Sequence, residues 1–209
     1  PDSSPAALYE VWVTRHLFPA LGCAFGAKGV FAALLLPGDI QSVIDVLEQP
    51  GAWFDNNAEG QLAALVDSTL AAAWDDCRAR LGDDPADWQW GAVHKLALTH
   101  PLAPVCPDVA AFNPAPLALG GSGSSVAMAA YRPSDFAAVV GPSVRMVIDV
   151  GGWDNSLFVN TPGQSGDPAS VHYGDLQQDW LNGGYKPLAY SRAAVDAVTG
   201  SLIVLEPAA

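Results

Sequence analysis

Hydrophobic side chains recur every three to four residues through the first 82 residues, which is the spacing of one face of an α-helix. Ser, Asp and Asn precede these runs as N-caps, and Pro or Gly follows them. In the last run, Glu59 is placed for a capping-box contact with the N-cap. The predicted helices begin at Ser3 or Ser4, at Asp39 and at Asn56 or Asn57, and they end at Pro19, at Pro50-Gly51 and at Gly82.

After residue 82 the pattern changes to short apolar stretches, several with alternating polarity. In the stretch 143–150, Val144, Met146, Ile148 and Val150 alternate with Arg145, Val147 and Asp149, which predicts a strand with one well-buried face. The segment 102–124, rich in Pro and Gly, is predicted to be one long irregular connection. Strands are predicted at 90–98, 125–131, 143–150, 156–160 and 202–205, and short helices at 173–181 and 191–198. This order predicts an α+β chain with a helical segment, 1–82, and a strand-rich segment with mostly antiparallel strands, 83–209.

The composition shows an unusually small share of charged residues. Half of the 209 residues are hydrophobic and only 15% are charged, whereas soluble domains average about 25%. We therefore expect part of the surface to be covered by another chain. The net charge is −13 and the basic residues are scattered singly, which argues against nucleic acid and anionic membranes as partners. No apolar run reaches the roughly 18 residues of a membrane span.

The first residues and the cysteines leave two questions open. Pro1 is followed by no basic or apolar leader, so we expect that the chain was released by cleavage from a longer protein. Whether that cut is maturation, later proteolysis or a chosen boundary is left open. Three cysteines allow at most one disulfide, and the states of Cys23, Cys77 and Cys106 are left open as well.

Common catalytic templates do not fit this sequence. A nucleophile elbow needs Gly-x-Ser-x-Gly, but the stretch 120–124 around Ser122 ends in Ser and the stretch 163–167 around Ser165 ends in Asp. A freestanding hydrolase using either serine is therefore a weak hypothesis. The glycine stretch also lacks the Lys of a phosphate-binding loop.

Metal-ligand patterns fail in the same way. The four histidines show no HExxH spacing, and a structural role is expected for them. Asp83, Asp84 and Asp87 lack the oxygen spacing of a calcium loop, which favours a solvated turn. We predict no catalytic residue, metal site or cofactor in this chain. The histidines are His16, His94, His100 and His172.

A set of residues in the second half nevertheless resembles a known family. The set comprises Trp90-Gly91, His94, His100-Pro101-Leu102, the glycines 120–123, the strand 145–149, the segment 160–166, Pro187 and Ser191-Arg192. In this order they resemble the C-terminal part of the β chain of the penicillin amidase (penicillin acylase) family. The resemblance covers residues 88–206, and the helical half fits more loosely. Pro-Gly-Gln-Ser-Gly at 162–166 is its most specific element.

The resemblance implies an N-terminal-nucleophile hydrolase with an αββα sandwich, of which this chain would be a partial piece. In that family a precursor is cut into α and β chains, and the N-terminal Ser of the β chain attacks an N-acyl amide such as a penicillin side chain or an acyl-homoserine lactone. Because this chain begins with Pro1, the nucleophile would lie upstream, and the chain alone would be inactive. The implied partners are the α chain, the N-terminal part of the β chain and a small-molecule N-acyl substrate, in a periplasmic or secreted enzyme.

Within this frame, two groups of residues carry expectations. Gly121, Ser122, Gly123 and Ser124 are candidates for the substrate-cavity wall, with packing as the alternative role. Gly163 and Gly166 would permit a tight bend in which Gln164 and Ser165 supply hydrogen bonds. Arg145 would need a partner from another element, because Asp149 is too far along an extended strand. The competing reading of the whole chain is a secreted acidic binding or scaffold module without catalytic activity.

Overall fold

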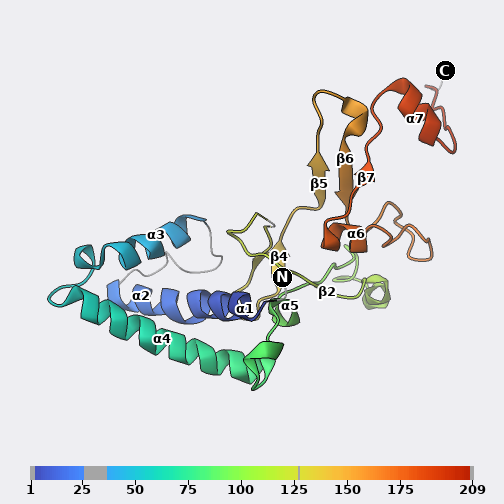
Figure 1. Cartoon of the computed structure of the whole chain (residues 1–209). Coiled ribbons are helices and arrows are strands. Elements are labelled where there is room, and N and C mark those ends of the chain that lie inside the picture. The colour runs from blue at the N-terminus through green and yellow to red at the C-terminus, as the bar shows by residue number, and fades with distance from the viewer. Residues whose placement is uncertain (1–2, 26–36, 127, 208–209) are drawn as a thin grey trace. The chain divides into compact units, whose positions relative to one another are not determined.

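The computed structural model describes residues 3–25, 37–126 and 128–207. They belong to two compact units, unit 1 (Pro1–Pro142) and unit 2 (Ser143–Ala209). Figure 1 shows helices and a small sheet in unit 1 and a second small sheet in unit 2. The change from helices to strands that the sequence indicates near residue 82 lies inside unit 1. The chain is therefore α+β, with mostly antiparallel pairing, as predicted.

The longest helix of unit 1, α4, runs beside α1 and contacts η1 and η2 (Figure 1). Their bounds are α1 Ser4–Val11, α2 Phe18–Phe25, α3 Pro37–Glu48 and α4 Ala58–Leu81, with a π-helical segment η1 at Trp12–Leu17 and a 3₁₀ turn η2 at Pro50–Ala52.

Two groups of buried side chains form the core of unit 1, because the apolar stripes of these helices face one another. One group consists of Ala7, Val11, Ala73, Cys77, Trp88, Trp90, Tyr131 and Phe136. The other consists of Val13, Leu17, Phe18, Leu21, Val43 and Val46.

Pro19 does not stop the first helix, so that prediction was wrong. The backbone N–H of Phe18 bonds to the carbonyl of Val13, five residues back, and α2 continues directly from there. Pro19 falls in the first turn of α2, where a missing N–H disturbs the backbone least. Leu17 and Leu21 are buried on both sides of it, so tertiary packing supports the continuous helix.

The third helix has the predicted length and the predicted N-cap residue, Asn57, but the predicted capping contacts are absent. Asn57 precedes α4 in the left-handed region, with φ of 60°, and its side chain makes no capping hydrogen bond. The predicted capping box with Glu59 is therefore not formed. The other end is as predicted, because Gly82 takes φ of +100°, a value that L side chains rarely adopt.

The sheet of unit 1 has the strand order β2-β1-β4-β3, and only the β1–β4 pair is parallel. The predicted strand 90–98 is wrong over its first half, where residues 90–93 form helix α5. Only the last two residues of the predicted strand 125–131 pair. The elements are α5 Trp90–Val93, β1 Lys95–Leu96, β2 Leu117–Ala118, β3 Ala130–Tyr131 and β4 Ala138–Val140, with 3₁₀ turns η3 at Pro85–Asp87 and η4 at Pro107–Phe112. Strand β2 and turn η4 lie in the segment predicted to be irregular.

Unit 2 is built on a three-stranded antiparallel sheet of order β5-β6-β7. Its elements are β5 Val144–Val147, η5 Trp153–Asn155, β6 Leu157–Asn160, α6 Gln177–Asn182, β7 Lys186–Pro187 and α7 Arg192–Val198. The predicted cap of the last helix is confirmed, because the Ser191 side chain accepts a hydrogen bond from the backbone N–H of Ala194. The predicted strand 202–205 is not formed.

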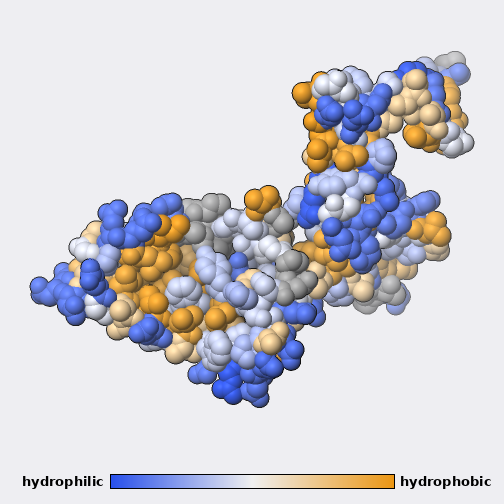
Figure 2. Space-filling model, in the orientation of Figure 1, coloured by the Kyte–Doolittle hydropathy of each residue, from blue (hydrophilic) through white to orange (hydrophobic). Residues whose placement is uncertain are grey.

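Strand β5 and its continuation expose the row of side chains that the alternating pattern predicted to be buried. Val144, Met146, Ile148 and Val150 are 44%, 58%, 43% and 77% exposed. A sheet face is buried only when a second layer covers it, and among the described residues of unit 2 no such layer covers this row. Figure 2 shows hydrophobic side chains on the surface of both units.

Candidate functional site around the glycine loop

The glycine loop, defined as residues 121–124, connects β2 to β3 in unit 1 and is fastened by its backbone. The indole N–H of Trp90 donates to the carbonyl of Gly121 at 2.9 Å. The N–H of Ser122 donates to the hydroxyl of Ser125 at 2.8 Å, and the carbonyl of Ser122 accepts from the N–H of Ala129 at 2.9 Å. Gly121 has φ of +79°, which favours glycine at this position. These hydrogen bonds therefore hold the first half of the loop, Gly121 and Ser122, in one conformation.

A carboxylate from a distant helix contacts β3, the strand that follows this loop. The Tyr131 hydroxyl donates to Oε2 of Glu10 at 2.5 Å, and the Ser122 hydroxyl accepts from the N–H of Ser124 at 3.4 Å. Glu10 lies on α1, Tyr131 on β3 and Ser122 in the glycine loop. The acid thus connects α1 with β3, and Ser124 at the end of the loop is exposed.

Burial governs the electrostatics of this cluster. Burial raises the pKa of Glu10, and the hydrogen bond from Tyr131 offsets part of that effect. Burial also raises the pKa of Tyr131, and the neighbouring charge of Glu10 adds to it. The phenol therefore keeps its proton and acts as a hydrogen-bond donor. A carboxylate that accepts a hydrogen bond from the Tyr131 hydroxyl fixes the position of that group.

Aromatic rings pack against Tyr131, the hydrogen-bond partner of Glu10. Trp90 stacks on His94 with ring centroids 4.9 Å apart, and Trp90 also contacts Tyr131 and Phe136 edge-on at 5.2 and 5.3 Å. The helical turn of α5 makes the first contact possible, because residues four apart share a helix face. His94 is completely buried, its Nδ1 lies 3.2 Å from the carbonyl of Leu119, and burial lowers its pKa. The ring is therefore neutral near pH 7.

The other predicted residues lie in unit 2. Arg145 donates from Nη1 to the carbonyl of Trp180 at 2.6 Å, and its guanidinium lies 4.4 Å from the centroid of that indole ring. The partner comes from α6, a different element, as the sequence required.

The segment 163–166 forms a tight bend in unit 2. The N–H groups of Gln164 and Ser165 both donate to the carbonyl of His172, at 2.9 and 3.0 Å. A Cβ on Gly163 would lie 2.3 Å from that carbonyl oxygen, whereas nothing lies within 4 Å of one on Gly166. Only the first glycine is required by close packing.

Sequence reasoning did not find Glu10 or Tyr131. They are 121 positions apart, so no local pattern joins them. The only signal in the sequence is that Glu10 is the single acidic residue of α1. In the structure this residue is half-buried, and half-buried acids usually have a polar partner.

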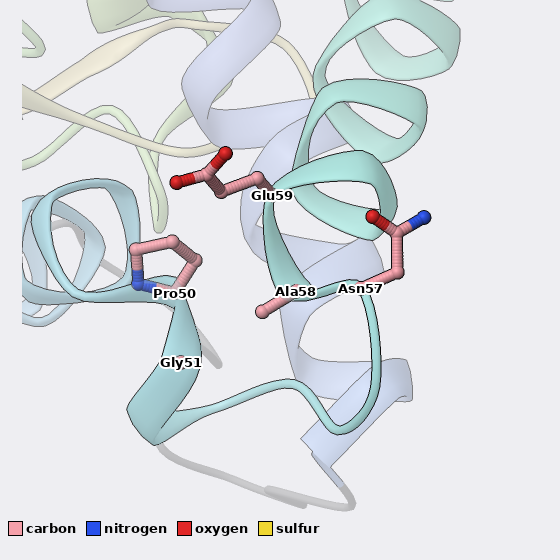
Figure 3. Close-up of a pocket in the computed structure, with 5 residues that line it drawn as sticks. All are labelled: Pro50, Gly51, Asn57, Ala58 and Glu59. Carbon is pink, nitrogen blue, oxygen red and sulfur yellow. The ribbon is translucent and has the colours of Figure 1, made fainter.

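A separate hollow lies between η2 and the first turn of α4. It is lined by Pro50, Gly51, Asn57, Ala58 and Glu59. Figure 3 shows that the Asn57 side chain is directed away from Pro50. The lining contains one carboxylate and none of the residues that the sequence analysis proposed for the substrate-cavity wall.

The histidines and cysteines of the described residues form no further candidate site. Side-chain hydrogen bonds of the four histidines go to carboxylates or backbone groups. Cys77 and Cys106 are free thiols, and burial raises the pKa of Cys77 to about 11; the Cys23 side chain lies outside the described residues. Across residues 3–25, 37–126 and 128–207, no group of three or more His, Cys, Asp or Glu is placed to hold a metal ion. No helix in these ranges is both long and apolar enough to cross a membrane.

Comparison with known proteins finds that this chain is similar to parts of acylases. It is 32% identical over 199 residues to an acyl-homoserine lactone acylase QuiP of Pseudomonas putida, a match that covers 90% of this chain and 24% of that protein. It is 31% identical over 231 residues to the protein of the same name from Pseudomonas aeruginosa, covering 99% of this chain and 27% of that protein. It is 41% identical over 119 residues to the penicillin acylase 2 proenzyme of Pseudomonas sp. strain SE83, covering 55% and 15%.

The chain spans about a quarter of the length of the first two of these curated relatives. The sequence model of the penicillin amidase family matches residues 1–197. Because that match covers nearly the whole sequence, the chain belongs to the penicillin amidase family.

Proposed function

We propose that this chain is the C-terminal portion of an N-acyl amide hydrolase, to which it contributes framework and a part of the substrate-cavity wall. The observation that carries this proposal is the pattern of coverage: nearly all of this chain matches only about a quarter of the acyl-homoserine lactone acylases. The nucleophile, an N-terminal Ser, belongs to an upstream segment of the same enzyme. The substrate is a small N-acyl compound such as an acyl-homoserine lactone or a penicillin.

The exposed apolar surface supports a framework role. The row on β5 and the segment 202–205 present side chains that a free protein surface rarely gathers together. The α chain and the N-terminal part of the β chain are the partners that cover them. The match to a penicillin acylase proenzyme agrees with an enzyme assembled from processed segments.

The glycine loop supports a role in the cavity wall. Its first half is fixed by hydrogen bonds from Trp90 and from the N–H of Ala129, while Ser124 at its far end is exposed. A loop whose backbone is fixed at one end and exposed to solvent at the other can contact a ligand without changing its conformation.

The full-length protein provides the test. We expect it to hydrolyse N-acyl-homoserine lactones or penicillins, and mass spectrometry of the purified enzyme should find a second chain together with one that begins with Ser, Cys or Thr. The 209-residue chain by itself should hydrolyse none of these substrates. Turnover by the lone chain would refute the proposal, and a full-length protein that is processed but inactive would favour the binding or scaffold module.

The proposed location is the periplasm or the outside of the cell. Fractionation of the producing bacterium should find the mature enzyme with periplasmic or secreted marker proteins. Recovery with cytoplasmic markers only would contradict this assignment.

A further inference from the structure

We propose that β5 is an open sheet edge that receives a β-strand from the upstream part of the same enzyme, which extends the sheet of unit 2 by backbone pairing. This inference rests on the proposed function only in taking the chain as one portion of a larger protein. It adds where the partner binds and by which groups, and it follows from a difference between the two edges of this sheet.

The backbone groups on the outer side of β5 follow from the register of the sheet. Val144 of β5 pairs with Asn160 of β6, and the carbonyl of Ser143 accepts from the N–H of Thr161 at 3.2 Å. Because successive residues of a strand direct their backbone groups to opposite sides, those of Val144 and Met146 point away from β6. In the part of the chain that the structure describes, β5 pairs with β6 alone, and β7 lies on the other side of β6 (Figure 1).

The opposite edge, β7, is protected against the addition of a strand. The N–H of Leu188 donates to the carbonyl of Ser156 at 2.8 Å, so Leu188 faces β6 and the preceding residue, Pro187, faces outward. Proline has no N–H to offer to an incoming strand, and Lys186 beside it carries a charge on a half-exposed side chain. Proline and lysine are residues with which natural sheets protect a free edge.

Strand β5 carries neither of these protective residues. Its four residues include one charge, Arg145, whose guanidinium lies on the face of the sheet that α6 covers, 4.4 Å from the centroid of the Trp180 ring. The other face presents Val144 and Met146, which are exposed. An apolar edge without protection is a site of strand addition or of aggregation. The contrast between the two edges of one sheet therefore indicates that β5 has a partner strand.

The rest of the enzyme is the source of that strand. The matches cover 90% and 99% of this chain but only 24% and 27% of the two acyl-homoserine lactone acylases, so about three quarters of such a protein lies outside this chain. A second copy is disfavoured, because two chains of net charge −13 repel each other. The chain's own apolar segment, 202–205, belongs to no sheet of the described residues. The incoming strand has apolar side chains at alternate positions, which pack against Val144 and Met146.

Amide hydrogen exchange in the assembled full-length enzyme, resolved to single residues, tests this pairing. Arg145 and Val147 face β6 and serve as the internal reference, because their N–H groups are bonded whether or not a partner is present. We expect Val144 and Met146 to exchange as slowly as the reference pair, about a hundredfold or more slower than in an unfolded chain. Fast exchange at Val144 and Met146 beside slow exchange at the reference pair would show a free edge and refute the proposal.

Two further measurements identify the occupant. Ile203→Pro in the full-length enzyme should leave the protection of Val144 and Met146 unchanged. Its selective loss there would show that the chain's own segment 202–205 is the occupant, which overturns the proposal. Protection should also be independent of enzyme concentration. If dilution removes it while sedimentation shows a dimer becoming a monomer, the occupant is a second copy, and the proposal is overturned in the same way.

Met146→Pro removes an N–H from the outer side of β5 and leaves the ladder with β6 intact, and Met146→Ala is the matched control that keeps this N–H. Proline is tolerated on a free edge but removes a hydrogen bond from a paired one. We expect the yield of assembled enzyme to fall about tenfold more in Met146→Pro than in Met146→Ala. Equal yields would contradict a paired edge. If Met146→Pro does not fold, the exchange pattern of the wild type still decides.

Catalysis is a separate readout. A full-length protein that is processed and assembled but inactive refutes the proposed function, while slow exchange at Val144 and Met146 still supports the partner strand. An active enzyme with fast exchange at these two positions refutes the partner strand and leaves the proposed function standing.

Discussion

At the scale of single residues, the half-buried acid Glu10 makes stability depend on pH in an unusual direction. Its pKa lies above the ordinary value of 4.5, because burial outweighs the hydrogen bond from Tyr131. The native state therefore binds this proton more tightly than the unfolded chain. The resulting stabilisation is complete below pH 4.5 and is lost as the pH rises through the native pKa.

Glu10→Gln removes this titration. The free energy of unfolding of the wild type, relative to that of Glu10→Gln, should fall as the pH is raised from below 4.5 to above the native pKa of Glu10. Urea denaturation at a series of pH values measures it. A constant difference between the two proteins would contradict the raised pKa.

Asp76 shows the opposite behaviour. Burial alone would raise its pKa, but hydrogen bonds from Arg80 and Arg15, at 2.7 and 2.8 Å, together with His16 at 3.2 Å, hold it below 3.8. Its contribution to stability is present above pH 3.8 and is lost as the pH falls through the native pKa.

Asp76→Asn should therefore destabilise the protein near pH 7 by about 1–2 kcal/mol, a value reduced by the solvent that reaches these side chains. The difference from the wild type should disappear in acid. Asp75→Asn is the control, since Asp75 is 79% exposed and lies 4.0 Å from Arg78. Equal losses in the two variants would contradict a special role for Asp76.

At the scale of elements, the predicted helices were largely found, whereas the predicted strands were mostly too long. Helix periodicity is a local property, and α4 buries its stripe, including Ala73 and Cys77, against its neighbours. Strands β1, β2 and β3 have two residues each, and β1 pairs with β2 and β4, which lie far along the chain from it. The same apolar stretch can therefore form a helical turn, as α5 does where a strand was predicted.

The bend between β6 and α6 can be tested with matched glycine variants. Gly163→Ala should displace the carbonyl of His172, because the new Cβ would lie 2.3 Å from its oxygen, and we expect a cost of about 1–3 kcal/mol. The N–H groups of Gln164 and Ser165 should then exchange faster in the full-length protein.

Gly166→Ala is the control for this bend, because nothing lies within 4 Å of the added Cβ. It should leave exchange at both positions unchanged and should cost less than about 0.5 kcal/mol. Equal effects of the two substitutions would show that the close approach at Gly163 does not hold the bend.

At the scale of the whole molecule, the small share of charged residues agrees with the apolar surface that the structure exposes. The four side chains of the segment 202–205 are 76%, 82%, 68% and 90% exposed, in addition to the row on β5. Apolar rows of this kind are typical of surfaces that another segment covers.

The isolated 209-residue chain should accordingly bind a hydrophobic dye such as ANS and should self-associate at high concentration, although its net charge of −13 opposes association. Met146→Lys with Ile203→Lys should reduce both effects in the isolated chain. Co-expression with the rest of the acylase should do so without substitutions. Dye binding that is the same in the isolated chain and in the assembled enzyme would contradict this expectation.

The sequence by itself determined the α+β class, most helices, the need of Arg145 for a partner outside its strand, and the resemblance that the family match confirms. Each follows from local spacing or from a short motif. Only the tertiary structure decided that the first helix continues through Pro19, that β5 exposes its apolar row, and that Glu10 meets Tyr131. These features depend on contacts between residues distant in sequence, and single-sequence patterns do not record which distant residues will meet.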